Sequence, residues 1–239
     1  KAYRFDPSDK SGYRSKEVAC MYEDNERKLW VGTMGGGLYF FDRSRNQFKP
    51  YQIHSRYEEA TDSYIRAIYG DNDGRLWIGT LSGLCILDPK NAKEVFYRPD
   101  EHTPGQLRPG IILSIFRDSQ QRMWIGTEKG LYLYNKVSNN FISFRHNDNN
   151  PSSIPKDGVN AIAESQHRLW IGTNDGLSCL SADLKTFRNF KYNAEDNNTL
   201  SGNLIYSIAP SGDDIWVGAE GGLNIVNTST GKVQRYNHD

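Results

Sequence analysis

Apolar and polar residues follow one another along the chain in short runs that recur in the same order. The first run carries two aliphatic residues three positions apart, such as Ile65 and Ile68, and a polar turn such as 71–74 follows it. A second run with letters such as WIGT comes next, and a Gly-Leu pair then begins a third run. Because runs this short are separated by Gly, Asn and Asp, and no window keeps a helical period, the pattern predicts β-strands.

A fourth run ends each unit with an aromatic residue, and the units repeat along the whole chain. All five tryptophans lie in the second run, at intervals of 47, 47, 46 and 46 residues: Trp30, Trp77, Trp124, Trp170 and Trp216. Four short antiparallel strands in a period of this length form the blade of a β-propeller. The sequence therefore predicts an all-β propeller fold with five four-stranded blades, over about 6–51, 52–97, 98–144, 145–190 and 191–239.

The residues that recur in every unit have structural roles in such a fold. We expect the Trp to fill the wedge between neighbouring blades with a large apolar side chain. The Gly two residues later, Gly79 in the second unit, permits a close backbone approach or a bulge. The Gly before Leu, Gly83 in the same unit, is expected to take a positive φ in a tight turn.

The combined pattern, I/V-x-x-I-x-x-D-x-x-G-x-L-W-I-G-T-x-x-G-L, resembles the two-component regulator propeller repeat, and the resemblance covers nearly the whole chain. The connectors 146–154 (HNDNNPSSI) and 193–200 (NAEDNNTL) agree with it, whereas 56–63 (RYEEATDS) departs from it. Blade one has an extra glycine at 35–37, and Ala219 replaces the usual Thr in blade five. These departures are features in which this sequence differs from the usual repeat, and they are compatible with the predicted fold.

The resemblance implies a place in the periplasmic sensor region of a hybrid two-component system of gut bacteria. Such a module would detect a carbohydrate, an oligosaccharide, to regulate polysaccharide utilisation. It would pass the signal through a membrane helix to a histidine kinase, both outside this chain. The implied partners are the oligosaccharide, adjacent blades or a second propeller of the parent chain, and a second copy in a homodimer, with no membrane contact by this segment.

The two ends of the chain suggest that it belongs to a longer array of blades. Residues 1–5 resemble the tail of a preceding fourth strand, and residues 232–236 the fourth strand of blade five itself. Because neither end then completes the blade of the other, we expect a seven-bladed parent, with a self-closed ring of five blades as the alternative. An open array would expose two sheet faces that ought to be buried.

Ligands of propellers usually meet the face that carries the turns between strands two and three and the loops after strand four. Those turns and the entries to the first strands vary from blade to blade on a fixed frame, as expected for a site placed on a scaffold. Aromatic faces, amides and carboxylates suit a sugar, although the polarity of solvated turns explains each residue equally well. The candidate ligand-binding residues are Tyr64, Arg66, Glu128, Lys129, Asn160, Asn174, Asp175, Asn203, Tyr206 and Glu220.

Composition excludes several other classes of protein. Because 29 Lys and Arg balance 29 Asp and Glu, and no basic stripe is visible, nucleic-acid binding is not expected. No apolar run approaches the roughly 18 residues of a membrane span. The three cysteines lack a CxxC spacing, and we expect neither a metal nor a cofactor. Four histidines fall in or after the connectors without a common register: His54, His102, His146 and His238.

Three functions remain: a ligand-sensing module, a propeller scaffold without its own ligand site, and a propeller glycosidase or lyase. Glycosidases use pairs of carboxylates, and no spacing singles out a pair among Asp62, Asp157, Glu17 and Glu128. The chain has no G-x-S-x-G elbow and no phosphate-binding glycine loop before a helix. We therefore predict no catalytic residues in this chain and favour the sensing module.

Overall fold

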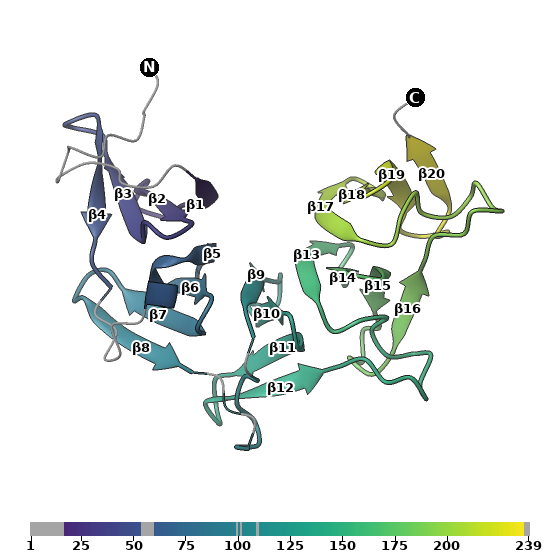
Figure 1. The fold of residues 1–239 in the computed structure, drawn as a ribbon, viewed down its shortest axis with the longest axis horizontal. Coiled ribbons are helices and arrows are strands. Elements are labelled where there is room, and N and C mark those ends of the chain that lie inside the picture. The colour runs from purple at the N-terminus through teal and green to yellow at the C-terminus, as the bar shows by residue number, and fades with distance from the viewer. Residues whose placement is uncertain (1–16, 54–59, 99, 101, 109, 237–239) are drawn as a thin grey trace. The chain divides into compact units, whose positions relative to one another are not determined.

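The computed structural model describes residues 17–53, 60–98, 100, 102–108 and 110–236. In this part the chain forms twenty β-strands, one short 3-10 helix and no α-helix. The strands make five four-stranded sheets, each with its strands in sequence order (Figure 1). The predicted all-β fold of five four-stranded propeller blades is thereby confirmed. No helix of the described residues is long and apolar enough to cross a membrane.

The chain divides into two compact units, residues 1–115 and 116–239. The first unit contains the two sheets that we name blade 1 and blade 2. Blade 1 consists of β1 (Val18–Glu23), β2 (Leu29–Thr33), β3 (Leu38–Asp42) and β4 (Gln47–Tyr51). Blade 2 follows the 3-10 helix η1 (Ala60–Ser63) and consists of β5 (Ile65–Gly70), β6 (Leu76–Thr80), β7 (Leu84–Asp88) and β8 (Lys93–Tyr97). Within this unit β5 packs against β1 and β2.

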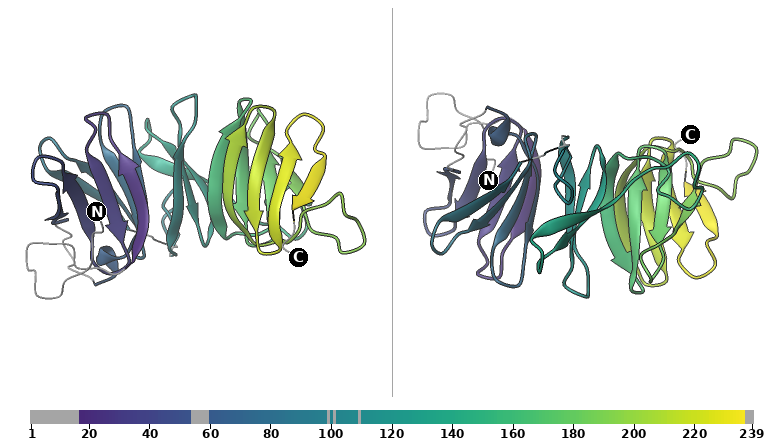
Figure 2. Two further views of the ribbon diagram at one scale, coloured as in Figure 1. Left: turned by 90° about the horizontal axis from the view of Figure 1, so that it is seen from above. Right: turned by 90° about the horizontal axis from the view of Figure 1, so that it is seen from below.

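The division between the units falls inside β9 (Ile112–Arg117), the first strand of blade 3. Blade 3 continues with β10 (Met123–Thr127), β11 (Gly130–Asn135) and β12 (Asn140–Phe144). Blade 4 consists of β13 (Val159–Ser165), β14 (Arg168–Thr173), β15 (Gly176–Leu180) and β16 (Phe187–Phe190). Blade 5 consists of β17 (Ile205–Ser211), β18 (Asp214–Ala219), β19 (Gly222–Asn227) and β20 (Val233–Tyr236). In this unit β17 packs against β13 and β14 (Figures 1 and 2).

The tryptophan strands form the centre of the core, because the first strand of the next blade covers them. Trp30, Trp77, Trp124 and Trp170 are at most 1% exposed. In the first unit Trp30 belongs to one apolar cluster with Ile65 and Ile68 of blade 2, and in the second unit Trp170 clusters with Ile205 of blade 5. The predicted role of Trp as the wedge between blades is confirmed for these contacts.

The glycine that follows each tryptophan by two residues leaves room for the neighbouring blade. A Cβ added to Gly172 would lie 2.6 Å from Cγ2 of Ile205, and one added to Gly32 would lie 2.5 Å from Cγ2 of Ile65. These glycines therefore allow close approach, whereas the β-bulge lies on the first strand, where the register shifts between Val159 and Ala161 opposite Gly172. The glycine before each Leu has the predicted positive φ, for example +126° at Gly176.

An aspartate in the turn between strands one and two ties the turn to the buried tryptophan in blades 1, 2 and 3. In blade 2 one carboxylate oxygen of Asp71 accepts the backbone N–H groups of Asp73 and Arg75, each at 3.0 Å. The other oxygen accepts the indole N–H of Trp77 at 2.9 Å and Nε of Arg75 at 2.8 Å. Asp24 and Asp118 bond Trp30 and Trp124 in the same way.

Blades 4 and 5 lack this aspartate and turn more tightly. In blade 4 the strands join through Gln166 and His167, both with positive φ, as a two-residue hairpin requires. The buried indole nitrogen of Trp170 has no hydrogen-bond partner in the structure. The shorter turn also explains why the tryptophan spacing falls from 47 to 46 residues after Trp124.

Blade 5 departs from the expected role of the tryptophan. Trp216 is 39% exposed, although its own sheet is complete and pairs it with Ile225. Within the described residues of the second unit, β18 has its main contacts inside its own sheet, whereas β14 of blade 4 is also covered by β17. The sequence repeat could not show this, because the residues of blade 5 match those of the buried blades.

Candidate functional site

In blades 1, 2, 4 and 5 the variable residue at the start of the first strand lies in a β-bulge. The register of β5 shifts between Ile65 and Ala67, and that of β17 shifts between Ile205 and Ser207, so Arg66 and Tyr206 have no partner across the strand. Asn160 in β13 and Ala19 in β1 occupy the same position. Bulges redirect a side chain out of the sheet and often adjoin binding sites. The bulge position of the first strand therefore carries a different side chain in each of these blades, whereas the Trp and Gly-Leu positions are the same in all of them.

Backbone hydrogen bonds join this position to the turns between strands two and three. In the first unit the turn of blade 1 bonds its own first strand, from Met34 N to Glu17 O at 3.1 Å. The same turn reaches blade 2, because Gly35 N and Gly37 N both donate to Ser63 O, at 3.2 and 2.9 Å. The predicted neighbourhood of these turns and strand entries is therefore present in this unit.

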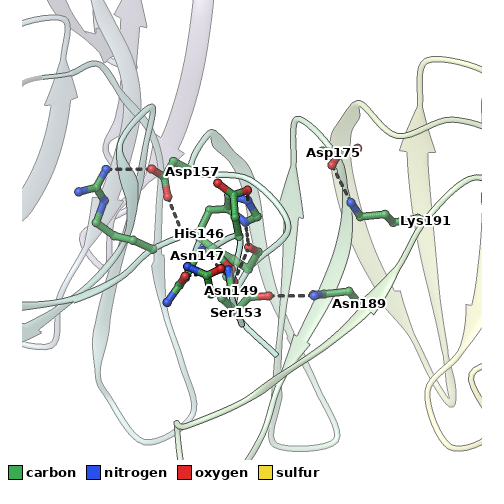
Figure 3. A network of polar contacts seen from close by, with 11 residues as sticks. His146, Asn147, Asn149, Ser153, Asp157, Asp175, Asn189 and Lys191 are labelled. Carbon is green, nitrogen blue, oxygen red and sulfur yellow. Dashed lines mark hydrogen bonds and ion pairs between the residues drawn. The ribbon is translucent and has the colours of Figure 1, made fainter. Parts of the chain in front are cut away.

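Five candidate residues lie in a connected polar rim across blades 4 and 5 in the second unit. Nδ2 of Asn160 donates to Oδ1 of Asn174 at 2.8 Å and to the carbonyl of Ile205 at 2.9 Å. Oε1 of Glu220 accepts the backbone N–H of Asn203 at 3.1 Å. Asp175 forms an ion pair with Lys191 at 2.7 Å (Figure 3). These side chains form the frame of the rim and position one another.

Four further candidate residues, Tyr64, Tyr206, Glu128 and Lys129, are exposed to solvent. Tyr206 is 60% exposed and Tyr64 37% exposed. Tyr64 forms an isolated bridge with Met34, and its ring would meet a Cβ added to Gly35 at 3.2 Å. Glu128 and Lys129 are exposed in the turn between β10 and β11. A ligand would reach these side chains without breaking the frame of the rim.

The first unit carries a shallow, open depression beside Arg66. Its other lining residues are Glu17, Val18, Ala19, Met34 and Leu113. Arg66 was predicted from its variability and its neighbours were not, although Ala19, Arg66 and Leu113 all lie eleven residues before a tryptophan. That fixed offset could have identified them.

Hydrogen bonds and ion pairs hold the two connectors that follow β12 and β16. In the connector between β12 and β13, Asp157 accepts the backbone N–H of His146 at 2.7 Å and pairs with Arg145 at 2.9 Å (Figure 3). Asn189 of β16 donates to the carbonyl of Ser153 at 2.8 Å. The next connector is held by Arg235 of β20, which donates to the carbonyls of Asn193, Asp196 and Thr199. Asp157, Asn189 and Arg235 therefore hold the connectors in place through their hydrogen bonds.

His146 links the two ends of its connector and gives it a pH dependence. The backbone carbonyl of Ile154 and the carboxylate of Asp148, each 2.8 Å from a ring nitrogen, raise its pKa above the usual 6.5. Because the folded pKa is raised, the stabilisation is complete below pH 6.5 and is lost as the pH rises through the folded value.

We expect Asp148→Asn to lower the pKa of His146 towards 6.5, because the variant removes one of the two groups that favour the protonated ring. The measurement is an NMR titration of the imidazole in both proteins. A pKa in the unaltered chain at or below 6.5 would contradict the assignment of these two contacts.

Asp62 and the three cysteines, which could have carried other chemistry, have structural surroundings that explain them. The carboxylate of Asp62 pairs with Arg98 at 2.9 Å and also bonds Ser82. Among the described residues no group of three or more His, Cys, Asp and Glu could hold a metal ion, and His54 and His238 lie outside those residues. Burial raises the pKa of the Cys20 thiol to about 12 and also raises the pKa of Cys85 and Cys179. All three therefore remain uncharged thiols at neutral pH.

Comparison with solved structures found similar folds in extracellular domains of putative two-component and one-component systems and in a lyase. The extracellular domain of a putative hybrid two-component system from B. thetaiotaomicron is 26% identical, with a TM-score of 0.76 over 95% of this chain and 29% of that one. The extracellular domain of a putative one-component system from the same organism is 18% identical, with a TM-score of 0.59 over 97% of this chain and 37% of that one. The chain thus spans less than two fifths of these domains.

A third structure shows that the same fold serves other proteins. Virginiamycin B lyase from Staphylococcus aureus is 15% identical, with a TM-score of 0.69 over 94% of this chain and 71% of that one. At this identity the similarity concerns the fold alone. The comparison with curated proteins gave no match.

The family model for the two-component regulator propeller matches residues 12–35, 60–82 and 106–129. These three segments contain the strand pairs whose turns carry Asp24, Asp71 and Asp118, each bonded to its tryptophan. The blades with the shorter turn lie outside the matched residues. The resemblance seen in the sequence is thereby confirmed in these three parts of the chain, which match the two-component regulator propeller repeat.

Proposed function

We propose that the chain is part of the ligand-sensing region of an extracytoplasmic two-component receptor, and that its rim binds an oligosaccharide. The similarity to the extracellular domain of a hybrid two-component system supports the receptor, because the likeness covers 95% of this chain. The location outside the cytoplasm rests on the same similarity. Regulation of polysaccharide utilisation follows as the role that such a receptor would have.

The observation that carries the proposal is the alternation of fixed and variable positions. Trp and Gly-Leu recur in every blade, whereas the bulge position changes from Ala19 to Arg66, Asn160 and Tyr206. A scaffold without a ligand has no need of a different redirected side chain in each blade. Guanidinium and amide groups match the hydroxyls of a sugar, and an aromatic ring covers the apolar face of a pyranose.

The ligand must also favour one of two states of the receptor, because equal binding to both would transmit nothing. The polar rim of blades 4 and 5 could couple ligand binding to such a change of state, because Asn160 donates a hydrogen bond to the carbonyl of Ile205 across the boundary between the blades. A ligand that competes for the Asn160 amide would change this contact. Contacts across a dimer or with a second propeller would then carry the change to the kinase.

Calorimetric titration of the complete polypeptide with a panel of plant and host oligosaccharides tests the proposal. We expect at least one saccharide to bind, and we expect combined alanine substitution of Asn160 and Tyr206, both in the second unit, to weaken that binding about tenfold or more, roughly 1.4 kcal/mol. The matched control replaces Arg43 and Gln120, which are exposed at turns away from the rim, and should leave binding unchanged. Unaltered binding in the rim variant would assign the chain to a scaffold, and no binding at all would argue against a carbohydrate ligand.

A further inference from the structure

Asn160 and Asn174 in blade 4 form a pair of side-chain amides, which we name the amide pair. Nδ2 of Asn160 lies 2.9 Å from the carbonyl oxygen of Ile205 and 2.8 Å from the side-chain oxygen of Asn174. Because a backbone carbonyl can only accept, the atom of Asn160 that faces Ile205 must belong to its NH2 group. The atom of Asn174 that accepts from the same NH2 group must then be Oδ1. One backbone carbonyl therefore fixes the orientation of both amides.

The amide pair keeps one acceptor and one donor group for a ligand. Both N–H bonds of the Asn160 side chain are engaged, so its remaining group is the acceptor Oδ1. Oδ1 of Asn174 is engaged, so its remaining group is the donor Nδ2. Among the described residues no hydrogen bond uses either of these two atoms. Asn174 is exposed and Asn160 is half-buried, so a ligand can reach the pair.

Gly158 provides the space that the Asn174 amide occupies. A Cβ added to the buried Gly158 would lie 2.8 Å from Cγ of Asn174 and closer still to its Nδ2. The backbone N–H of Asn174 donates to the carbonyl of Gly158 at 3.0 Å, so the turn lies directly against the strand entry. The other blades carry larger residues at this entry position: Glu17, Tyr64, Ile111 and Leu204. An Asn in the turn and a Gly at the entry therefore occur together in blade 4 and in no other blade of the chain.

Blade 5 shows a different arrangement where the entry residue is larger. Glu220 holds the position of Asn174, and its backbone N–H donates to the carbonyl of Leu204 at 3.0 Å in the same way. Its carboxylate accepts the backbone N–H of Asn203 at 3.1 Å, so it bonds the strand entry and not the bulge residue Tyr206. The contact between a turn side chain and a bulge side chain is thus particular to blade 4 in this unit.

We infer that the amide pair selects saccharides that carry an acetamido group, an inference that rests on the proposed function of the rim. A hydroxyl group donates and accepts and rotates to suit its partner, so a fixed donor beside a fixed acceptor does not distinguish one hydroxyl from another. An acetamido group has a fixed N–H donor and a fixed carbonyl acceptor. Its N–H donates to Oδ1 of Asn160, and its carbonyl accepts from Nδ2 of Asn174.

The surroundings of the amide pair suit a neutral sugar of this class. Tyr206 follows Ile205, whose carbonyl holds Asn160, and the tyrosine is 60% exposed. Its ring can cover the apolar face of a pyranose or the methyl group of the acetamido substituent. Next to Asn174, the carboxylate of Asp175 pairs with Lys191 at 2.7 Å, so these two charges compensate each other. A neutral acetamido sugar therefore fits this part of the rim better than an acidic one.

Calorimetric titration of the complete polypeptide with matched disaccharides tests the inference. N-acetyllactosamine and lactose differ only in an acetamido against a hydroxyl group, and so do the sugar units of N,N′-diacetylchitobiose and cellobiose. We expect the acetamido member of at least one of these pairs to bind about tenfold or more tightly than its hydroxyl counterpart, because two hydrogen bonds to the amide pair are lost in the counterpart.

Two variants show whether the amide pair causes this preference. Asn174→Asp keeps the oxygen that accepts from Asn160 and replaces only the donor Nδ2, so we expect the preference to disappear. Gly158→Ala should also abolish it, because the new Cβ displaces the Asn174 amide, and it should change the preference no further in the Asn174→Asp background. Gln120→Ala is the matched control, since it removes an exposed amide from the turn between β9 and β10 and should leave the preference unchanged.

The outcomes separate the inference from the proposed function. Saccharide binding that the combined substitution of Asn160 and Tyr206 weakens, but that shows no preference for acetamido sugars, would overturn the inference alone. A preference that survives Asn174→Asp would do the same, because the donor would then lie elsewhere. If no saccharide bound, or if binding were indifferent to Asn160 and Tyr206, the proposed function would be wrong and the inference with it.

Discussion

Gly172→Ala is expected to destabilise the second unit by about 1–3 kcal/mol, the range for an overfilled core. The new Cβ would lie 2.6 Å from Cγ2 and 3.1 Å from Cβ of Ile205, which is fully buried between blades 4 and 5. The neighbour cannot move without opening the blade interface, because Ile205 also pairs with Ala219 in its own sheet. Denaturant unfolding of both proteins measures the difference in the free energy of unfolding.

Gly218→Ala is the matched control for this substitution. Gly218 holds the same position in blade 5, but its new Cβ would meet only Ser207, at 2.6 Å from the hydroxyl oxygen. Since Ser207 is exposed, its side chain can rotate away, and the loss should be well below that of Gly172→Ala. Equal losses would show that the glycine serves the strand itself and would contradict its role in blade packing.

Asp71→Ala is expected to cost about 2–4 kcal/mol of stability, because one buried carboxylate holds four donors. The substitution leaves the indole N–H of Trp77 buried without its acceptor and releases the turn that joins β5 to β6. Each charge-assisted hydrogen bond of this kind contributes more than a neutral one. The measurement is again the midpoint of denaturant unfolding.

Asp73→Ala removes the same charge from the same turn and is the control. The Asp73 side chain is 56% exposed, and its ion pair with Arg75 at 3.0 Å lies at the surface. Exposed pairs contribute about 0–1 kcal/mol, so a small loss is expected. If Asp73→Ala proved as damaging as Asp71→Ala, the loss would come from net charge and not from the bond to Trp77.

The sequence was sufficient to predict the blades because their signal is periodic and local. Five tryptophans in register, with glycine two residues later and a Gly-Leu turn, define both the strand order and the wedge between blades. The exposure of Trp216 could not be predicted, because burial depends on what lies against the residue and blade 5 has the same sequence signals as blade 4. The tighter turns of blades 4 and 5 were not predicted, although the tryptophan spacing of 46 instead of 47 residues indicated that one residue is missing from each of these repeats.

The sequence predicted that the variable turns and strand entries lie near one another, but it did not predict the β-bulges that lie at the strand entries. Variable positions at the turns and strand entries do lie together within each unit, as the bonds from Met34 to Glu17 and from Gly176 to Asn203 show. The bulge that redirects Arg66, Asn160 and Tyr206 has no local sequence signal, because it depends on pairing with the next strand. The ion pair of Asp175 with Lys191 joins residues sixteen apart and could not be foreseen from spacing.

Backbone hydrogen exchange with and without the tightest-binding oligosaccharide is the most direct test of the central claim, that the rim of bulges and turns is a ligand site. We predict slower exchange at the strand entries 158–160 and 203–206 and at the turns beside them. Protection confined to the turns at 24–28, 71–75 and 118–122, or to no part of this chain, would contradict it.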